Sequence, residues 1–433
     1  MVGKSHFILF LLTIALMLSS TACTDREKDA EAAKEGTQSS GKTLKVYYGN
    51  WHHSLNASVL RDFKELHKDI TIEEESINLN DFDAFRKRFT TELMAGETAD
   101  IISLPGYCFP GGSNLMASGA LYDLNPVIAE DKEFKLGDYN EVVMDTGVYE
   151  GKRYVIPVDY IFYYMDTYKS ILDESNIELD LSNWTWEVLT DITEKFHRGN
   201  KGTARYSFLW FDILHILSSG RNTFVDYEAK TSGFNSPEFI AILNIYKRLL
   251  PSVCPEDERE SLSADVEKCL NTVLFGIRSG GIPDIVTSNN IVKKAEGEDA
   301  IILPCPSVDG EMYTPSYVSN AVAIASKCRY PKEAFDFIKI ILSKKKQVNS
   351  LINNPVNKAV LDENIRSLEL KKISQENIKR ITDIVANVRD CDFGDDSYSS
   401  IVRGEMDDFI SGRKTAEQTA KTIDEKVTLF LNE

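Results

Sequence analysis

The chain has 433 residues, of which 42% are hydrophobic and 27% are charged, and this composition excludes a disordered or low-complexity polymer. Lys and Arg number 49 and Asp and Glu number 67, so the formal net charge is −18. Nucleic acid and anionic lipid headgroups are poor partners for so acidic a protein, because both carry negative charge themselves. A neutral or cationic small molecule, or another protein, remains possible as the partner.

The N-terminus has the features of a secretory signal peptide over residues 1–22. Lys4 precedes an apolar run from Phe7 to Leu18, and this run is shorter than the roughly 20 apolar residues of a membrane-spanning helix. Small residues and then Cys23 follow, which resembles the bacterial lipoprotein cleavage box, where the cysteine becomes a lipidated N-terminus. An ordinary cleavage site with a free Cys23 is the alternative. The polar residues 23–42 predict a flexible tether.

Six further cysteines follow the tether: Cys108, Cys254, Cys269, Cys305, Cys328 and Cys391. An even number in an extracellular protein permits disulfides. A bond between Cys254 and Cys269 would close a short loop and contribute roughly 3 kcal/mol. Buried free thiols are an equally open alternative.

The body of the chain alternates strand and helix patterns. In chain order we expect a strand at 44–48, a helix at 59–66, a strand at 70–72, a helix at 82–93 and a strand at 100–104. This order implies a mostly parallel sheet covered by helices. The loop 105–112 then lies at the carboxyl end of a strand, where sheets of this kind bind ligands.

Further elements follow with clear start signals. We expect a short strand at 154–157, followed by the aromatic run 160–164, and helices that begin after Thr185 and Ser236. Apolar spacing predicts two more helices, at 334–342 and 416–430.

Six segments, in this order along the chain, resemble the extracellular solute-binding proteins of sugar importers, the maltose-binding-protein class. They are Glu97–Ile102, Gly119–Pro126, Tyr154–Pro157 with Tyr163–Tyr164, Trp184–Leu189, Ala334–Lys339 and Leu429–Glu433. Each motif alone is weak, but six in register after a lipoprotein-like N-terminus are specific. Met165 departs from the pattern, because the family usually has Asn there.

The resemblance implies an α/β fold of two lobes, mostly parallel sheets flanked by helices and a hinged cleft between them, with crossings near Pro157, Pro304 and Asn320. The implied first lobe comprises residues 43–157 and 301–320, and the implied second lobe comprises 158–300 and 321–433. The implied function is to capture a sugar or oligosaccharide and deliver it to the permease subunits of an ABC importer. We expect a monomer without cofactor, metal or catalytic residues, held by its lipid at the outer face of the cytoplasmic membrane of a Gram-positive cell.

Candidate ligand residues follow from the chemistry of sugars, which present an apolar C–H face and a rim of hydroxyls. Resemblance and loop position suggest seven: Trp51, Tyr107, Asp159, Trp210, Gly281, Asp284 and Tyr398. The aromatic residues would stack on the sugar, Asp159 and Asp284 would accept from hydroxyls, and Gly281 would approach through its backbone. Asn50 and His52 are weaker candidates. Trp184 and Trp186 lie in a helix-start motif and are expected in the core.

Other chemistries have little support in the sequence. It contains no G-x-S-x-G, phosphate-binding Walker loop, G-x-G-x-x-G or H-E-x-x-H motif. The acidic segment 390–396 fails as a calcium loop, because Gly394 stands at position five rather than six. Two alternatives stay open: a surface-anchored polysaccharide-processing enzyme, and a binding protein for a solute other than a sugar.

Overall fold

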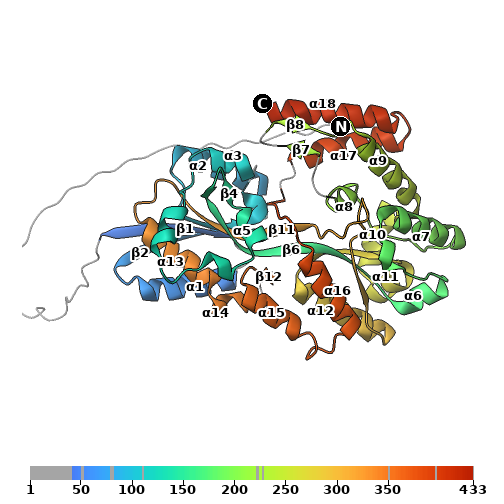
Figure 1. Ribbon diagram of the computed structural model, residues 1–433, viewed down its shortest axis with the longest axis horizontal. Coiled ribbons are helices and arrows are strands. Elements are labelled where there is room, and N and C mark those ends of the chain that lie inside the picture. The colour runs from blue at the N-terminus through green and yellow to red at the C-terminus, as the bar shows by residue number, and fades with distance from the viewer. Residues whose placement is uncertain are drawn as a thin grey trace, which may run out of the picture. The chain divides into compact units, whose positions relative to one another are not determined.

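A mixed sheet of eight strands runs through the described part of the chain (Figure 1). The structure, a computed structural model, describes residues 41–49, 53–78, 82–109, 112–220, 224–226, 229–349, 352–394 and 397–432. The strand order is β10-β6-β11-β3-β1-β2, and β9 and β12 (Asn354–Pro355) also pair with β6. Residues 40–433 form one unit, and within it the chain has the expected two-lobed α/β architecture.

The sheet is parallel only in its first part. Strands β1 (Lys42–Gly49), β2 (Ile70–Ile77) and β3 (Ile101–Pro105) pair in parallel, as their alternation with helices predicts. Strand β11 (Ser316–Ile324) is antiparallel to both β3 and β6. The expectation of mostly parallel pairing is therefore wrong beyond β1–β3, because β6 and β11 run in opposite directions between the lobes.

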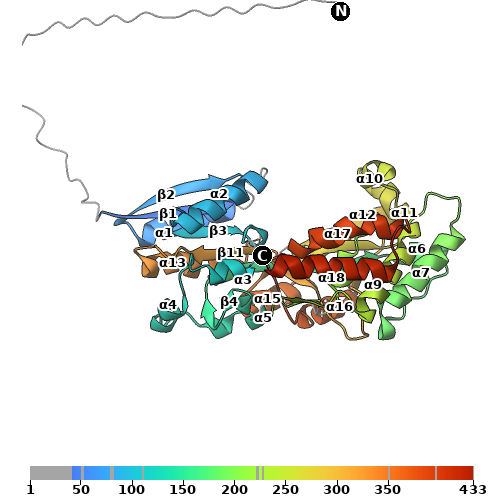
Figure 2. The same ribbon diagram turned by 90° about the horizontal axis from the view of Figure 1, so that it is seen from above.

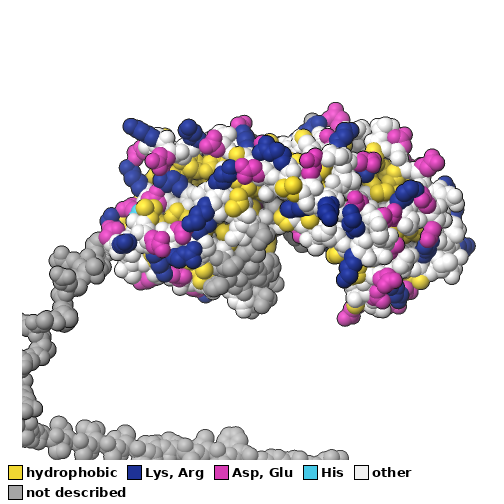
Figure 3. Space-filling model, turned by 90° about the horizontal axis from the view of Figure 1, so that it is seen from below, with side chains coloured by type: hydrophobic (Ala, Val, Ile, Leu, Met, Phe, Trp, Pro, Cys, Tyr) yellow, Lys and Arg dark blue, Asp and Glu magenta, His cyan; other side chains and the backbone are white. Residues whose placement is uncertain are grey.

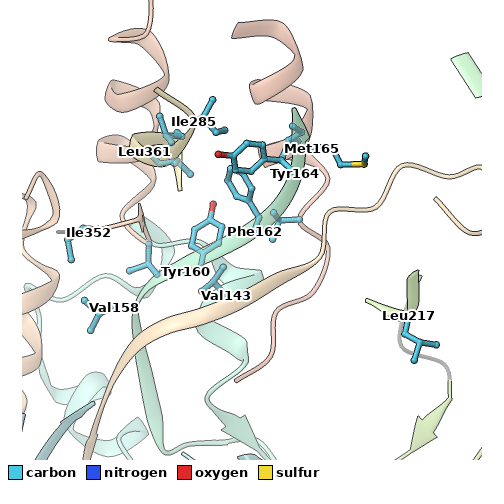
Figure 4. Close-up of a cluster of buried hydrophobic side chains, with 14 of the residues drawn as sticks. Val143, Val158, Tyr160, Phe162, Tyr164, Met165, Leu217, Ile285, Ile352 and Leu361 are labelled. Carbon is cyan, nitrogen blue, oxygen red and sulfur yellow. The ribbon is translucent and has the colours of Figure 1, made fainter. Parts of the chain in front are cut away.

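Strand β6 (Val155–Thr167) connects the two halves of the sheet. Its first part pairs with β11, and its last part pairs with β9 (Gly276–Gly280) and β10 (Ile301–Pro304). The predicted strand at 154–157 was too short, because the aromatic run continues the same strand. Tyr160, Phe162 and Tyr164 of this run alternate along it and pack into the core (Figure 4).

Helices around the first part of the sheet follow the predicted apolar spacing. Helix α1 (His53–Leu66) packs against α13 (Pro331–Leu342), and α2 (Phe82–Ala95) buries Phe85, Phe89 and Leu93. The shorter helices of this region are α3 (Gly112–Ala117), α4 (Asn125–Glu130), α5 (Glu141–Asp145) and α14 (Lys344–Gln347). The predicted elements from residue 44 to residue 104 are all present.

Helices around the other end of β6 begin where their capping residues predict. Thr185 Oγ1 accepts from Val188 N before α7 (Trp186–Gly199), and Ser236 Oγ accepts from Phe239 N before α9 (Pro237–Leu249). Helix α17 (Ser397–Ile410) lies beside α18 (Ala416–Asn432) (Figure 2). The remaining helices are α6 (Lys169–Glu174), α8 (Leu214–Leu217), α10 (Glu256–Ser263), α11 (Val266–Thr272), α12 (Ile282–Glu296), α15 (Lys358–Arg366) and α16 (Gln375–Ala386). Trp184 and Trp186 are buried, as expected.

The surface carries charges of both signs, and Lys and Arg alternate with Asp and Glu across both lobes in the view of Figure 3. No helix within the described ranges is long and apolar enough to cross a membrane. The six cysteines after the tether are free thiols, and those of Cys254 and Cys269 belong to one small apolar cluster. The structure therefore favours free thiols over the disulfide alternative.

Candidate ligand-binding site

A cavity of about 440 Å³ lies where segments from distant parts of the chain converge on strands β6 and β11. The loop after β3 contributes Pro105 and Tyr107, and the segment 210–218 contributes the opposite wall. Residues 392–394, together with Tyr398, Ser399 and Arg403 of α17, complete the lining. Cavities of this volume, between lobes, are typical binding sites for small molecules.

Seven aromatic side chains line the cavity. They are Tyr107, Tyr163, Trp210, His215, Tyr317, Phe393 and Tyr398. The Trp210 side chain is 50% exposed although it is large and apolar. Its ring packs edge-on against the His215 ring, with centroids 4.8 Å apart. Half of an anchored indole is thus available to a ligand, which suits stacking.

The floor of the cavity comes from the two strands that connect the lobes. Tyr163 of β6 and Tyr317 of β11 meet edge to face, with centroids 5.6 Å apart and an interplanar angle of 89°. Along β6 the neighbours Phe162 and Tyr164 point into the core. Because side chains alternate along a strand, Tyr163 faces the other way and reaches the cavity.

Polar groups form a rim around these rings. Arg403 Nε of α17 donates to Asp212 Oδ2 at 2.9 Å, and Asp212 Oδ1 accepts from Leu214 N at 2.8 Å. Asp212 thereby holds the first residue of helix α8 and ties it to α17. Ser218 and Ser319 also line the cavity, each with a hydroxyl that can donate and accept.

Burial shapes the protonation of the cavity groups. It raises the pKa of the Tyr317 phenol well above its ordinary value of 10.0, and the nearby Asp392 carboxylate adds to this effect. Burial likewise raises the pKa of Tyr107. Both phenols therefore keep their protons at neutral pH and can donate hydrogen bonds.

The arrangement is suited to holding a small polar molecule with apolar faces. Aromatic rings offer plates for such faces, and the hydroxyl, guanidinium and carboxylate groups of the rim offer donors and acceptors. In the described ranges, no group of three or more His, Cys, Asp or Glu side chains could hold a metal ion.

Three of the predicted ligand residues meet at this cavity. Tyr107, Trp210 and Tyr398 come from positions far apart in the sequence, and all three line it. The fold thus brings together three of the residues that we expected to contact a ligand.

Asp159 lies elsewhere, at the junction of β6 and β11. It is fully buried. Asn320 Nδ2 donates to its Oδ1 at 2.8 Å, and the main-chain N–H of Asn353 donates to its Oδ2 at 2.9 Å. We expected Asp159 to accept hydrogen bonds from a ligand. Its carboxylate instead points into the junction of β6 and β11 and not into the cavity, so its hydrogen bonds join the crossing strands.

Gly281 and Asp284 also lie away from the cavity, at the start of α12. Asp284 Oδ2 accepts from Gly281 N at 2.7 Å and so caps the helix. A Cβ on Gly281 would lie 2.5 Å from the main-chain carbonyl of Asn353. The two residues serve a helix start and a close backbone approach, and the expected ligand contacts do not follow from their positions.

Four residues considered from the sequence lie outside the described ranges: Cys23, Asn50, Trp51 and His52. The other residues that line the cavity were not predicted as ligand contacts, among them Tyr163, His215, Tyr317 and Arg403. Tyr163 had a usable signal, namely its place in the alternation of β6. The others depend on contacts between distant segments.

Comparisons with known proteins place the chain in a broad context. The family model described as "Bacterial extracellular solute-binding protein" matches residues 48–348. A search of curated proteins finds no significant match.

Several solved structures share the fold. The sugar-binding protein MalE from Xanthomonas citri matches with a TM-score of 0.71 and 16% identity, over 90% of this chain and 98% of that one. The substrate-binding protein Lmo0181 from Listeria monocytogenes, in complex with cycloalternan, matches with a TM-score of 0.66 and 15% identity, over 90% and 99%. The cyclic α-maltosyl-1,6-maltose binding protein from Arthrobacter globiformis matches with a TM-score of 0.64 and 16% identity, over 90% and 98%.

Proposed function

Because this chain belongs to the bacterial extracellular solute-binding protein family, we propose that it captures a neutral sugar or oligosaccharide in the cavity between its lobes and delivers it to the permease of an ABC importer. One observation carries the proposal: a cavity of about 440 Å³, with seven aromatic side chains in its lining, sits on the two strands that connect the lobes. The choice of ligand is supported by structural relatives that are described as a sugar-binding protein, as a complex with cycloalternan and as a cyclic α-maltosyl-1,6-maltose binding protein.

The charges of the cavity favour a neutral ligand. Arg403 and Asp212 pair with each other, and the other charged residue of the described lining is Asp392, so the cavity offers no further cation and only one further carboxylate. An anion would need further cations, and a polyamine would need several free carboxylates. Hydroxyl groups of a sugar can instead use both the donors and the acceptors of the rim.

We assign stacking roles to Tyr107, Trp210 and Tyr398. Burying one such ring against a sugar contributes roughly 1.5–3 kcal/mol. Two rings with a few hydrogen bonds can then support a micromolar dissociation constant, near −8.2 kcal/mol, after the costs of ordering are subtracted.

The lobes would close on the ligand about strands β6 and β11. The buried Asp159 carboxylate, held by Asn320 and Asn353, lies at this junction and would serve as a pivot. Closure brings polar and aromatic groups of both lobes onto the ligand. Solution scattering should show a smaller radius of gyration with saturating saccharide, and an unchanged radius would count against closure.

The N-terminus would anchor the protein as a monomer at the outer face of the cytoplasmic membrane. In this proposal Cys23 carries the lipid, residues 23–42 form the tether, and the body contacts the permease rather than the bilayer. Mass spectrometry of the mature N-terminal peptide should show a diacylglyceryl group on Cys23, and Cys23→Ala should release the protein into the soluble fraction. An unmodified Cys23 in membrane fractions would refute the anchor.

Titration calorimetry tests the choice of ligand. The mature protein would be titrated with maltose, maltotriose, other neutral oligosaccharides, amino acids and short peptides, and each saccharide would be recovered and analysed for cleavage. We expect a saccharide to bind and to be recovered intact. Binding of peptides alone would favour another solute, and cleavage of the saccharide would favour the enzyme alternative.

A further inference from the structure

His215 is an unusual member of the cavity lining. It lies in α8, it lines the cavity, and yet only 7% of its surface is exposed. Its ring is held on several sides by aromatic neighbours. Phe211 stacks on it with centroids 5.4 Å apart, and Trp210 and Tyr163 meet it edge-on at 4.8 and 5.9 Å. The imidazole therefore fixes the position of the half-exposed indole.

The hydrogen bonds of His215 define which ring nitrogen carries the proton. Nδ1 lies 3.0 Å from Asp212 N and also 3.0 Å from Asp212 O. The carbonyl oxygen already accepts from the main-chain N–H of His215 at 3.0 Å. The N–H of the partly buried Asp212, by contrast, has no other acceptor within the described ranges, and an N–H shielded from water without an acceptor is costly.

Nδ1 must therefore offer its lone pair to the Asp212 N–H. In a neutral imidazole the proton then sits on Nε2. No described residue hydrogen-bonds to Nε2, and this nitrogen is not among the buried polar atoms that lack a partner. It is consequently accessible from the cavity, as an N–H donor.

We infer that His215 is a specificity-determining residue of this cavity: its neutral ring gives the ligand one N–H donor from Nε2 and holds Trp210 in place, and protonation of the ring weakens binding. The inference rests on the proposed function for the identity of the ligand. A hydroxyl or ring oxygen of a saccharide is the acceptor that this donor would recognise.

The surroundings of the ring oppose its protonation. Burial lowers the pKa of His215 from its ordinary value of 6.5, and the Arg403 guanidinium of α17 acts in the same direction. The Asp212 main chain and carboxylate act in the opposite direction. Tyr163 of β6 faces the ring and Tyr246 of α9 packs against Phe211. Burial raises the pKa of Tyr246 to about 12, so this phenol is neutral at physiological pH.

Protonation would add a hydrogen to Nδ1, so that the ring carries one on each nitrogen, and the new hydrogen would face the Asp212 N–H. The Asp212 N–H would lose its acceptor, and Nδ1 would donate to the Asp212 carbonyl oxygen 3.0 Å away. The ring would tilt from the first group towards the second, and the Trp210 ring that packs against it would move with it. The ligand would then lose a well-placed plate. We therefore expect affinity to be constant near neutral pH and to fall as the pH drops below the ordinary histidine range.

Two measurements test this inference, the first without any ligand. Nitrogen NMR of protein with ¹⁵N-labelled histidine should show Nδ1 without a proton and Nε2 with one, and a titration midpoint below the ordinary histidine pKa of 6.5. His215→Phe identifies the signal by its loss. The opposite tautomer, or a higher midpoint, overturns the inference.

The second measurement is calorimetry with maltotriose at about pH 7.5 and about pH 5. Wild type should bind about fivefold to tenfold more weakly at the lower pH, and His215→Phe should be weaker by a similar factor at both. His215→Gln, which restores an N–H donor, should recover part of the affinity without the pH dependence. His197→Gln, in the last turn of α7, is the matched control and should behave as wild type.

The outcomes separate the two proposals. Equal affinities of wild type and His215→Phe at both pH values overturn the role of His215, while saccharide binding itself stands. Absence of maltotriose binding at both pH values counts against the proposed function, and the NMR result then decides the inference: the expected tautomer and midpoint support the donor, and the opposite tautomer overturns it.

Discussion

Replacing Trp210 with alanine should weaken saccharide binding by a factor that the structure lets us work out. The side chain is 50% exposed without ligand. A tryptophan presents about 200 Å² of surface, so a sugar can cover about 100 Å² of it. At about 25 cal/mol per Å² this contributes about 2.5 kcal/mol, or about 60-fold in the dissociation constant. We take about tenfold as the smallest effect consistent with stacking, because removing water from the sugar on binding offsets part of this gain.

The assay is calorimetry with the saccharide that wild type binds most tightly. Trp210→Phe should retain part of the affinity, since a smaller ring still offers a plate. Leu370→Ala is the control, because Leu370 is 87% exposed and lies away from the cavity. Circular dichroism should show that each variant is folded. Wild-type affinity in a folded Trp210→Ala protein would refute stacking on this residue.

Three further predictions concern stability and thiols. Asp159→Asn should lower the free energy of unfolding by about 1–3 kcal/mol, because an amide N–H would face the donors of Asn320 or Asn353. Urea unfolding measures this change. A loss below about 0.5 kcal/mol would show that the junction tolerates the substitution. Lys346 and Lys345 hold the pKa of Asp62 at about 2, below its ordinary value of 3.8, so this carboxylate stabilises the fold above pH 3.8 and the contribution is lost as the pH falls towards 2. Asp62→Asn should therefore cost up to about 1 kcal/mol at neutral pH, and the difference from wild type should vanish near pH 2; a difference that is independent of pH would contradict the ion pair. Denatured, unreduced protein should release six titratable thiols from the body of the chain, and two fewer would reveal a disulfide.

Most of the fold could be predicted because its elements carry strong local signals. Thr185 and Ser236 cap α7 and α9 as their sequences indicate. The length of β6 could not be predicted, because Tyr160, Phe162 and Tyr164 lie in an almost continuous apolar and aromatic run that hides the strand alternation. The antiparallel β11 depends on a pairing with β6 and β3 across more than a hundred residues.

The site was predictable only in part, for a related reason. Tyr107 could be proposed because it follows a predicted strand, at the edge where such sheets bind ligands. Trp210 and Tyr398 could be proposed because their positions resemble those at which the family often has an aromatic residue. Asp159 could not be placed, because one residue on a crossing strand faces the cavity or the junction according to its register. His215 reaches the cavity from the start of α8, where it is held by hydrogen bonds with Asp212, and no local sequence pattern indicates this.

Fluorine NMR of protein labelled with 5-fluorotryptophan tests the central claim most directly, because the chain has only 4 tryptophans. Trp210→Phe would assign the Trp210 signal. On saturation with a bound saccharide, we predict a clear shift of the Trp210 signal, while the signals of the buried Trp184 and Trp186 stay in place. Saturation that leaves the Trp210 signal unchanged would contradict capture of the sugar in this cavity.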